Sequence, residues 1–455
     1  MKYPSRNISL RVMAAALLLL GSRGAACGAE ARILPYPIHQ KQLANGLNVV
    51  TVPYPSPGLA AFYIVVRAGS RDEIEPGKTG FAHFFEHMMF RGTDKYPKEK
   101  YSDVLKGTGA SANANTSEDR TVYHMTGNAD KLETMFEVEA DRFQNLKYSV
   151  QDFKTEAGAV KGEYIKNSAS PYVQLEEKIA ETAFQAHTYG HTTMGYFKDI
   201  VAMPDQYDYS REFFRRFYRP EHTTILVVGS VTPKAVEALA DRYFGRWPRG
   251  AYVSIIPQEP VQSATRYTHL QQAGFPPFLS LNYKGPAFSD TGMDVPALDV
   301  LSAILFSEKS DLYKKLVLHE QKVRSLGGGC SDARDPGLIS ISASLVQADD
   351  LQGVKDEIVR ALEVAKTKPV DARVLAETKS HLRYSFLMGL DNPTDIAESL
   401  SHYTWLTGDP EALNRLYALY EKVTAGDLLR VANKYFVNTA LTVATLSPAA
   451  DVGVQ

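Results

Sequence analysis

One sequence pattern occurs twice in this chain and limits the folds that it can adopt. Residues 211–231 ("REFFRRFYRPEHTTILVVGSV") and 426–448 ("GDLLRVANKYFVNTALTVATLSP") both predict a helix, an aromatic pair, a short turn and an apolar strand. Residues 60–70 ("AAFYIVVRAGS") and 277–287 ("PFLSLNYKGPA") also match as strands at a similar offset. Because a chain of 455 residues is too long for one core, the repeat predicts two related halves.

Each half is predicted to be of the α+β class, because strand patterns alternate with amphipathic helical patterns in both. The Pro-rich stretch 254–264 ("SIIPQEPVQSA") has the composition of a linker. We therefore expect an N-terminal half at 32–250, a linker at 251–265 and a C-terminal half at 266–449.

Residues 1–29 are predicted to be an export signal. Basic residues precede the apolar run "VMAAALLLLG" (12–21), and small residues follow it. Ten apolar residues are too few to span a bilayer, and no later segment is long enough, so no transmembrane segment is predicted. The mature chain is expected in the periplasm or another extracytoplasmic compartment. A lipid anchor on Cys27 is the less favoured alternative, because Gly24 stands where lipoprotein signals usually carry Leu.

The charge balance narrows the classes of partner. The formal net charge is −2, and 22% of the residues are charged. The chain thus has no excess of basic residues that would attract nucleic acid or an anionic membrane. We expect a protein or peptide partner and no nucleic acid.

The segment "FAHFFEHMMFRGT" (81–93) places His83, Glu86 and His87 in an otherwise apolar run. On a helix, His83 and His87 lie four positions apart on one face and can bind one cation, while Glu86 projects toward the same region. This is H-x-x-E-H, the inverse of H-E-x-x-H. The repeat offset (277 − 60 = 217) carries His83 to Val300, in the helical segment "VLSAI". Core packing of this helix therefore does not need histidines, which favours a metal site over a structural role.

A catalytic zinc site usually has a third protein ligand. Residues 152–167 carry Glu156 and Glu163, seven positions apart and hence on one helix face. On this spacing, either glutamate could be the ligand. The equivalent helix of the second half has Ala376 and Arg383 near these positions, so the carboxylate pair also occurs only beside the histidines. A solvated helix face, the alternative reading, explains the glutamates alone but not this co-occurrence.

Five segments together point to one protein family. They are "HFFEH" (83–87), the Glu156/Glu163 pair, "NANTSEDRTVY" (113–123), "TYGHTTMGY" (188–196) and "FYRPEHTTILVVGSV" (217–231). With these motifs the chain resembles the pitrilysin/insulinase family of metallopeptidases, in particular its processing-peptidase-like branch. The resemblance covers nearly the whole mature chain.

This resemblance implies a fold, an activity and a set of site residues. Each half would be a mostly antiparallel sheet flanked by helices. The chain would be a zinc endopeptidase with one Zn²⁺ bound by His83, His87 and Glu163. Glu86 would be the general base that activates the attacking water, and Glu156 would support the site from behind the ligands.

Residues 111–127 ("SANANTSEDRTVYHMTG") are expected to form a strand with one wet side, because they are rich in short polar and β-branched residues. An exposed edge could bind an extended peptide by strand addition. In the family, the Asn-Ala dipeptide that matches Asn113 and Ala114 lies on such an edge. An interior strand or a hairpin is the alternative.

In one respect the chain departs from the family pattern. Self-sufficient members carry an Arg and a Tyr that help to stabilise the reacting carbonyl, whereas Val317 and Arg324 occupy those positions here. Losing one such donor typically costs about a hundredfold or more. In heterodimeric members a related chain without H-x-x-E-H supplies the pair, so we expect this chain to be the zinc-bearing subunit of a heterodimer. A self-sufficient homodimer and a non-catalytic scaffold subunit are the alternatives.

Overall fold

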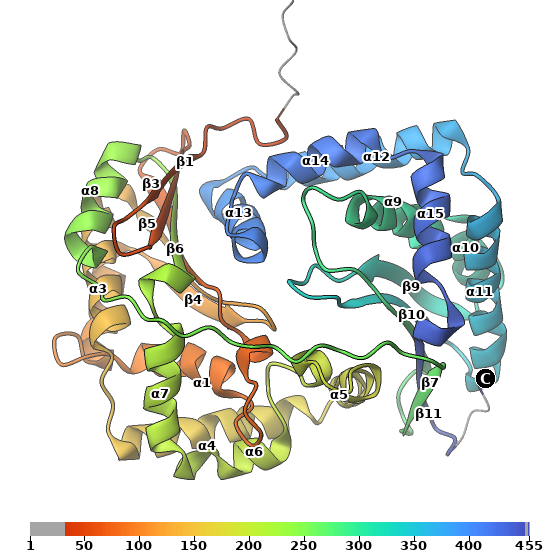
Figure 1. Ribbon diagram of the computed structural model, residues 1–455, viewed down its shortest axis with the longest axis horizontal. Coiled ribbons are helices and arrows are strands. Elements are labelled where there is room, and N and C mark those ends of the chain that lie inside the picture. Colours follow the sequence, from red (N-terminus) through yellow and green to blue (C-terminus); the bar gives the residue numbers. More distant parts are fainter. Residues whose placement is uncertain (1–31, 451–453, 455) are drawn as a thin grey trace, which may run out of the picture. The chain divides into compact units, whose positions relative to one another are not determined.

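The first half is built on a six-stranded sheet. The computed structural model describes residues 32–450 and Val454, and within them the first sheet has the order β1-β2-β6-β3-β5-β4 (Figure 1). β2 and β6 are parallel, and the other neighbouring strands are antiparallel. The strands are β1 (His39–Gln42), β2 (Asn48–Pro53), β3 (Leu59–Val66), β4 (Ser111–Thr116), β5 (Thr121–Asn128) and β6 (Thr223–Gly229).

Burial on both faces explains the central strands of this sheet. All residues of β6 are buried, and so is every residue of β3 after Leu59. A strand that is buried on both sides appears in the sequence as a continuous apolar run, which is the pattern of "TILVV" in β6. The helices of this part of the chain are α1 (Phe81–Met88), α2 (Lys98–Thr108), α3 (Leu132–Asn145), α4 (Val150–Asn167), α5 (Pro171–Ala183), α6 (Phe197–Ala202), α7 (Tyr207–Phe217) and α8 (Pro233–Phe244).

The second sheet repeats the plan of the first. Its order is β7-β11-β8-β10-β9, with β7 parallel to β11 and the other pairs antiparallel. These strands correspond in that order to β2, β6, β3, β5 and β4, which confirms the predicted α+β fold of two related halves. Its strands are β7 (Arg266–Gln271), β8 (Phe278–Lys284), β9 (Val323–Cys330), β10 (Leu338–Leu345) and β11 (Leu441–Ser447). Its helices are α9 (Asp294–Phe306), α10 (Asp311–Tyr313), α11 (Leu351–Thr367), α12 (Ala372–Met388), α13 (Pro393–Thr407), α14 (Ala412–Lys422) and α15 (Ala425–Tyr435).

One helix from each half packs on the sheet of the other half. α13 lies beside the first sheet (Figure 1) and packs against β3 and β6. There Ile396 and Leu400 share a hydrophobic cluster with Tyr63. α5 packs against β7 and β11, where Leu175 shares a cluster with Leu446. Because an apolar sheet face must be covered, each half completes the core of the other.

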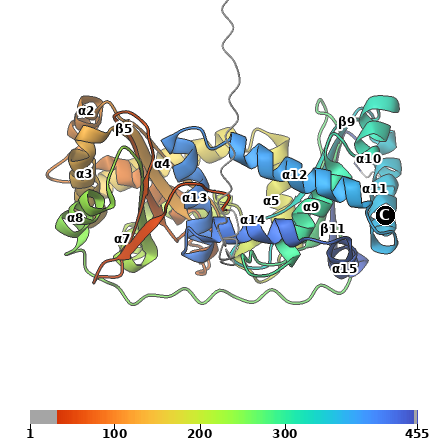
Figure 2. The same ribbon diagram turned by 90° about the horizontal axis from the view of Figure 1, so that it is seen from above.

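The segment between α8 and β7 contains no helix or strand from residue 247 to residue 265, and Figure 2 shows it as an extended connection. It is fastened at Glu259. The carboxylate of Glu259 accepts hydrogen bonds from the backbone N–H groups of Gln185, Ala186 and His187 at 2.9 to 3.1 Å. The connection is therefore tied to the loop that follows α5.

Two expectations concern membranes and export. The predicted signal peptide and Cys27 lie outside the described residues. Among the helices that are described, none combines the length and the apolar character that crossing a membrane requires. Export therefore stays a prediction from the sequence.

Candidate metal centre

Helix α1 carries the H-x-x-E-H motif, and defined contacts hold its start. Gly80 precedes the helix with φ at 89°, in the left-handed region that favours glycine. The buried side chain of Glu73 accepts hydrogen bonds from the backbone N–H groups of Gly80 and Ala82, both at 2.7 Å. These N–H groups have no partner within the helix, so Glu73 fixes the position at which α1 begins.

The apolar residues of α1 determine where the motif faces. The helix buries one face completely in the core of the first half, and this face consists of Phe81, Phe84, Phe85 and Met88. At 3.6 residues per turn, His83, Glu86 and His87 lie on the opposite face. His83 is buried, whereas Glu86 and His87 are half-buried. Core packing thus aims the polar residues at α4.

Two histidines of α1 and one glutamate of α4 converge on one point. The Oε2 atom of Glu163 lies 3.7 Å from Nε2 of His83 and 3.3 Å from Nε2 of His87. One ligand atom from each of the three residues lies within 4.8 Å of the others. Two imidazoles and one carboxylate are a donor set of catalytic zinc sites, so the residues fit the metal that the sequence predicts. Glu156 is not part of this set.

The two histidines are in different electrostatic environments. Burial, together with the neighbouring His87, lowers the pKa of His83 well below its usual value. His83 is therefore neutral at pH 7, which is the form that binds a metal ion. The hydrogen bond with Glu156 raises the pKa of His87. That bond engages Nδ1 at 3.1 Å and leaves Nε2 directed at Glu163.

Glu156 connects His87 to an arginine that the sequence reasoning missed. Oε1 of Glu156 contacts His87, and Oε2 accepts hydrogen bonds from the guanidinium of Arg91. Burial alone would raise the pKa of Glu156, but the bonds from His87 and Arg91 outweigh it and lower that pKa. A carboxylate that holds the second nitrogen of a ligating histidine fixes the orientation of the ring. Arg91 follows His87 by four positions, so helical spacing was the available signal.

We expect Arg91→Met to weaken zinc binding without removing a ligand. The variant loses the group that holds Glu156 against His87, and losing an outer contact of this kind costs about 10- to 100-fold in metal affinity. Competition with a zinc-chelating dye measures the affinity. Lys98→Met is the matched control. Lys98 lines the same small cavity as Arg91 and Glu156, but within the described part of the chain only His87 and Arg91 bond to the Glu156 carboxylate. Equal zinc affinities of wild type and Arg91→Met would contradict the orienting role.

Glu86 lies beside the metal-binding set and is held from β4. The hydroxyl of Thr116 donates a hydrogen bond to Oε2 of Glu86 at 2.6 Å. Burial raises the pKa of Glu86, while Thr116 and His87 oppose this shift. A cavity of about 260 Å³ adjoins the carboxylate and is lined by Glu86, His87, Phe90, Arg91, Lys98, Asn113 and Glu156. No spacing pattern in the sequence indicated the contact with Thr116.

The expected single strand over 111–127 is wrong, because this segment forms a hairpin. β4 and β5 pair antiparallel from Ser111↔Thr126 to Thr116↔Thr121, with a turn between them. β4 is an edge strand, and among the described residues only β5 pairs with it. Asn113 is exposed on this strand, whereas Ala114 is buried. The alternative of a hairpin is the one that the structure has, with β4 keeping a free edge.

Two family models match the chain. The one described as insulinase (peptidase family M16) matches residues 49–196, which include the H-x-x-E-H motif and Glu163. The one described as the peptidase M16 inactive domain matches residues 206–382. The chain is therefore matched over most of both sheets.

Several relatives align with nearly the whole chain. The zinc protease PqqE of Helicobacter pylori is 27% identical over 448 residues, which cover 96% of this chain and 98% of the relative. A probable mitochondrial-processing peptidase subunit beta of Arabidopsis thaliana is 24% identical over 423 residues, which cover 90% of this chain and 78% of the relative. The crystal structure of a protease from Helicobacter pylori superimposes with a TM-score of 0.84 at 27% identity and covers 91% of this chain and 100% of that chain. From its two family matches and these relatives, the chain belongs to the insulinase (M16) family of peptidases.

Proposed function

We propose that this chain is a zinc-dependent endopeptidase that hydrolyses peptides or unfolded polypeptide segments. The observation that carries the proposal is the convergence of His83, His87 and Glu163, with Glu86 on the same face of α1. Three protein ligands leave one position of a zinc site open for water. Membership of a peptidase family supports the same conclusion.

The residues of the chain divide the work of hydrolysis. Zinc, when bound, supplies a Lewis acid that polarises the peptide carbonyl and acidifies a water molecule. Glu86 accepts the proton of this water and later donates it to the leaving amine. Its raised pKa favours this role, because a base works best when its pKa lies near the working pH. Glu156 orients the ring of His87.

We propose that β4 binds the substrate as an additional strand. An edge strand presents unpaired N–H and C=O groups, and these bind an extended peptide without reading its side chains. Asn113 and Ala114 lie at the middle of β4, and Asn113 also lines the cavity beside Glu86. This placement brings the backbone of a bound peptide close to the base.

We further propose that full activity needs a homologous partner subunit. Val317 lies in a helical turn at Lys314–His319 and Arg324 lies on β9, and neither has the side chain that self-sufficient family members use there. A related chain that lacks H-x-x-E-H and carries the Arg/Tyr pair would stabilise the negative charge on the reacting carbonyl. The complex would be a heterodimer with this chain as the zinc-bearing subunit.

The division of the chain and its location complete the proposal. Residues 32–250 would be the zinc-binding half, 251–265 the linker, and 266–449 the homologous half without a metal site. The basic and apolar pattern of residues 1–29 supports removal of a signal peptide and export to the periplasm or an equivalent compartment.

The experiment that tests the function is cleavage of an unstructured quenched-fluorescence peptide by the zinc-loaded mature chain, with Glu86→Gln as the blank. We expect turnover close to the blank for the chain alone. Addition of a homologous subunit with the Arg/Tyr pair should raise kcat by about a hundredfold or more. Rapid cleavage by the chain alone would support the enzyme and contradict the need for a partner. No cleavage in either form would contradict the peptidase proposal and favour a scaffold.

A further inference from the structure

Thr116 is the last residue of β4, and its side chain reaches the base of the proposed reaction. Among the described residues, the bond from Oγ1 of Thr116 to Oε2 is the only hydrogen bond to the carboxylate of Glu86. A glutamate side chain has several rotatable bonds, so this contact selects its rotamer. With Oε2 engaged, Oε1 remains to accept a proton.

The turn that follows Thr116 is packed tightly against the loop before α1. The carbonyls of Ser117 and Glu118 accept hydrogen bonds from the backbone N–H groups of Ser70 and Arg71, at 3.4 and 2.7 Å. A Cβ atom on Gly69 would lie 2.3 Å from both of these carbonyl oxygens, so only glycine permits this approach. The turn therefore cannot shift without moving this loop.

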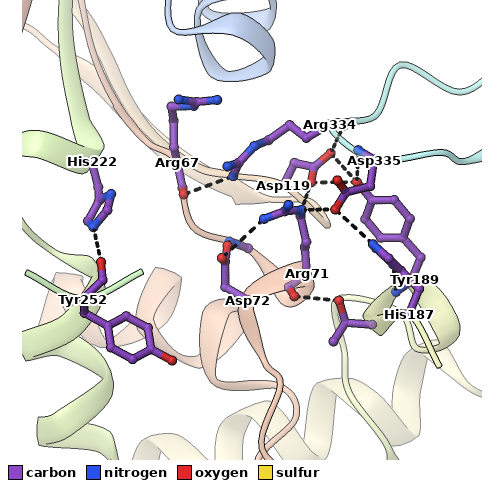
Figure 3. A network of polar contacts seen from close by, with 12 residues as sticks. Arg67, Arg71, Asp72, Asp119, His187, Tyr189, His222, Tyr252, Arg334 and Asp335 are labelled. Atoms are coloured by element: carbon purple, nitrogen blue, oxygen red, sulfur yellow. Dashed lines mark hydrogen bonds and ion pairs between the residues drawn. The ribbon is translucent and has the colours of Figure 1, made fainter. Parts of the chain in front are cut away.

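Asp119, in the same turn, joins it to the second half of the chain. Its carboxylate is buried, accepts hydrogen bonds from the hydroxyl of Tyr189 at 2.8 and 2.9 Å, and accepts another from the backbone N–H of Arg334 at 2.9 Å (Figure 3). Arg334 lies in the loop between β9 and β10. One carboxylate thus contacts both halves.

A second carboxylate strengthens this junction. Asp335 accepts a hydrogen bond from Arg71 at 2.6 Å (Figure 3). Nδ1 of His187 accepts from the backbone N–H of Tyr189, so a neutral His187 carries its proton on Nε2 and donates it to Asp335 at 2.9 Å. The backbone N–H of Asp335 donates to the hydroxyl of Tyr189 at 3.3 Å. Through Asp335, the loop between β9 and β10 therefore bonds to three further residues of the first half.

We propose that Thr116 is a positioning residue for Glu86, and that the second half holds Thr116 in place through Asp119. The inference rests on the proposed function of Glu86 as the base. The base would be correctly placed only while the loop between β9 and β10 is docked on the turn after β4. Because β4 is also the proposed peptide-binding edge, the same strand would position both the substrate and the base.

The first test replaces Thr116 with Val, which keeps the shape and removes the donor, and with Ser, which restores it. We expect Thr116→Val to lower kcat by about ten- to a hundredfold, because a small misplacement of a catalytic group has this effect. KM, zinc content and the affinity for an uncleaved peptide should stay unchanged, and Thr116→Ser should recover most of kcat. A Thr116→Val variant with normal kcat, or one that loses zinc, overturns the positioning role.

The second test is a double-mutant cycle with Tyr189→Phe. This change removes the hydroxyl that donates to Asp119 and that accepts from the backbone N–H of Asp335 in the second half, and it does not touch Glu86. Alone, this change should lower kcat by about two- to thirtyfold. In the Thr116→Val background it should have little further effect, because coupled residues are not additive. The matched control is Thr126→Val, which breaks a 2.9 Å hydrogen bond to Thr394 of the second half and should leave kcat within about twofold. Additive effects of Tyr189→Phe and Thr116→Val overturn the coupling.

The assays use whichever form of the wild type hydrolyses the peptide, the chain alone or its complex. If no wild-type form does, the proposed function fails and this inference fails with it. If the wild type is active and Thr116→Val is equally active, only this inference fails.

Discussion

Replacing Glu86 with Gln is expected to abolish peptide hydrolysis and to leave zinc binding intact. The amide oxygen of Gln can still accept the hydrogen bond from Thr116, so the side chain keeps its place. An amide cannot take up the proton of the attacking water. Removing a general base costs about 10²- to 10⁴-fold in rate, and we expect a loss at the upper end of this range.

Two measurements on the same preparation check this result. Peptide cleavage reports kcat, and elemental analysis reports zinc per chain, which should be that of the wild type. Glu99→Gln, an exposed glutamate of α2, is the matched control and should behave as wild type. Substantial hydrolysis by Glu86→Gln at full zinc content would assign the base to another residue.

Replacing His83 with Ala is expected to remove zinc from the chain. Only two ligating side chains then remain. Removing a residue that supports a ligand typically lowers metal affinity by about 10- to 100-fold, and we expect the loss of a ligand itself to lower it further. Activity disappears as a consequence, because both the Lewis acid and the acidified water are lost. The fold should persist, since the equivalent helix α9 packs without histidines.

Zinc content after dialysis against a weak chelator is the decisive measurement, and circular dichroism checks the fold. His269→Ala is the control, because His269 lies on β7 of the second sheet and bonds to Thr445 and to the backbone of Ala449. It should keep zinc at the wild-type level. Full zinc stoichiometry in a folded His83→Ala variant would contradict the assignment of His83 as a ligand.

The two halves and the helix of the H-x-x-E-H motif could be predicted because each is indicated by residue patterns within single helices and strands. The spacing of His83 and His87 by four positions belongs to any helix, and its apolar neighbours decide which face is buried. For Glu156 and Glu163, patterns within one helix are not enough to identify the ligand. Both lie on one face of α4, and spacing left either as the third ligand. Only the packing of α4 against α1 brings Glu163 to the two Nε2 atoms and Glu156 to Nδ1 of His87.

The hairpin at 111–128 was only the alternative prediction, for a related reason. Its turn consists of ordinary polar residues, so no Gly or Pro interrupts the polar and β-branched pattern. The exchange of α5 and α13 between the halves also has no local signal. An amphipathic helix reveals that one face is buried, but not which sheet covers it.

The sequence predicted the two α+β halves, the helix that presents His83, Glu86 and His87, and the carboxylate pair that could complete a zinc site. The tertiary structure alone decided which carboxylate meets the imidazoles, that Arg91 holds Glu156, and that Thr116 and Asp119 connect the base to the second half. The difference lies in how far apart in the chain the interacting residues are. Periodicity and burial record what one element needs from its own residues, whereas a contact such as that of Asp119 with Arg334 joins residues that are far apart in the chain and depends on how whole elements pack.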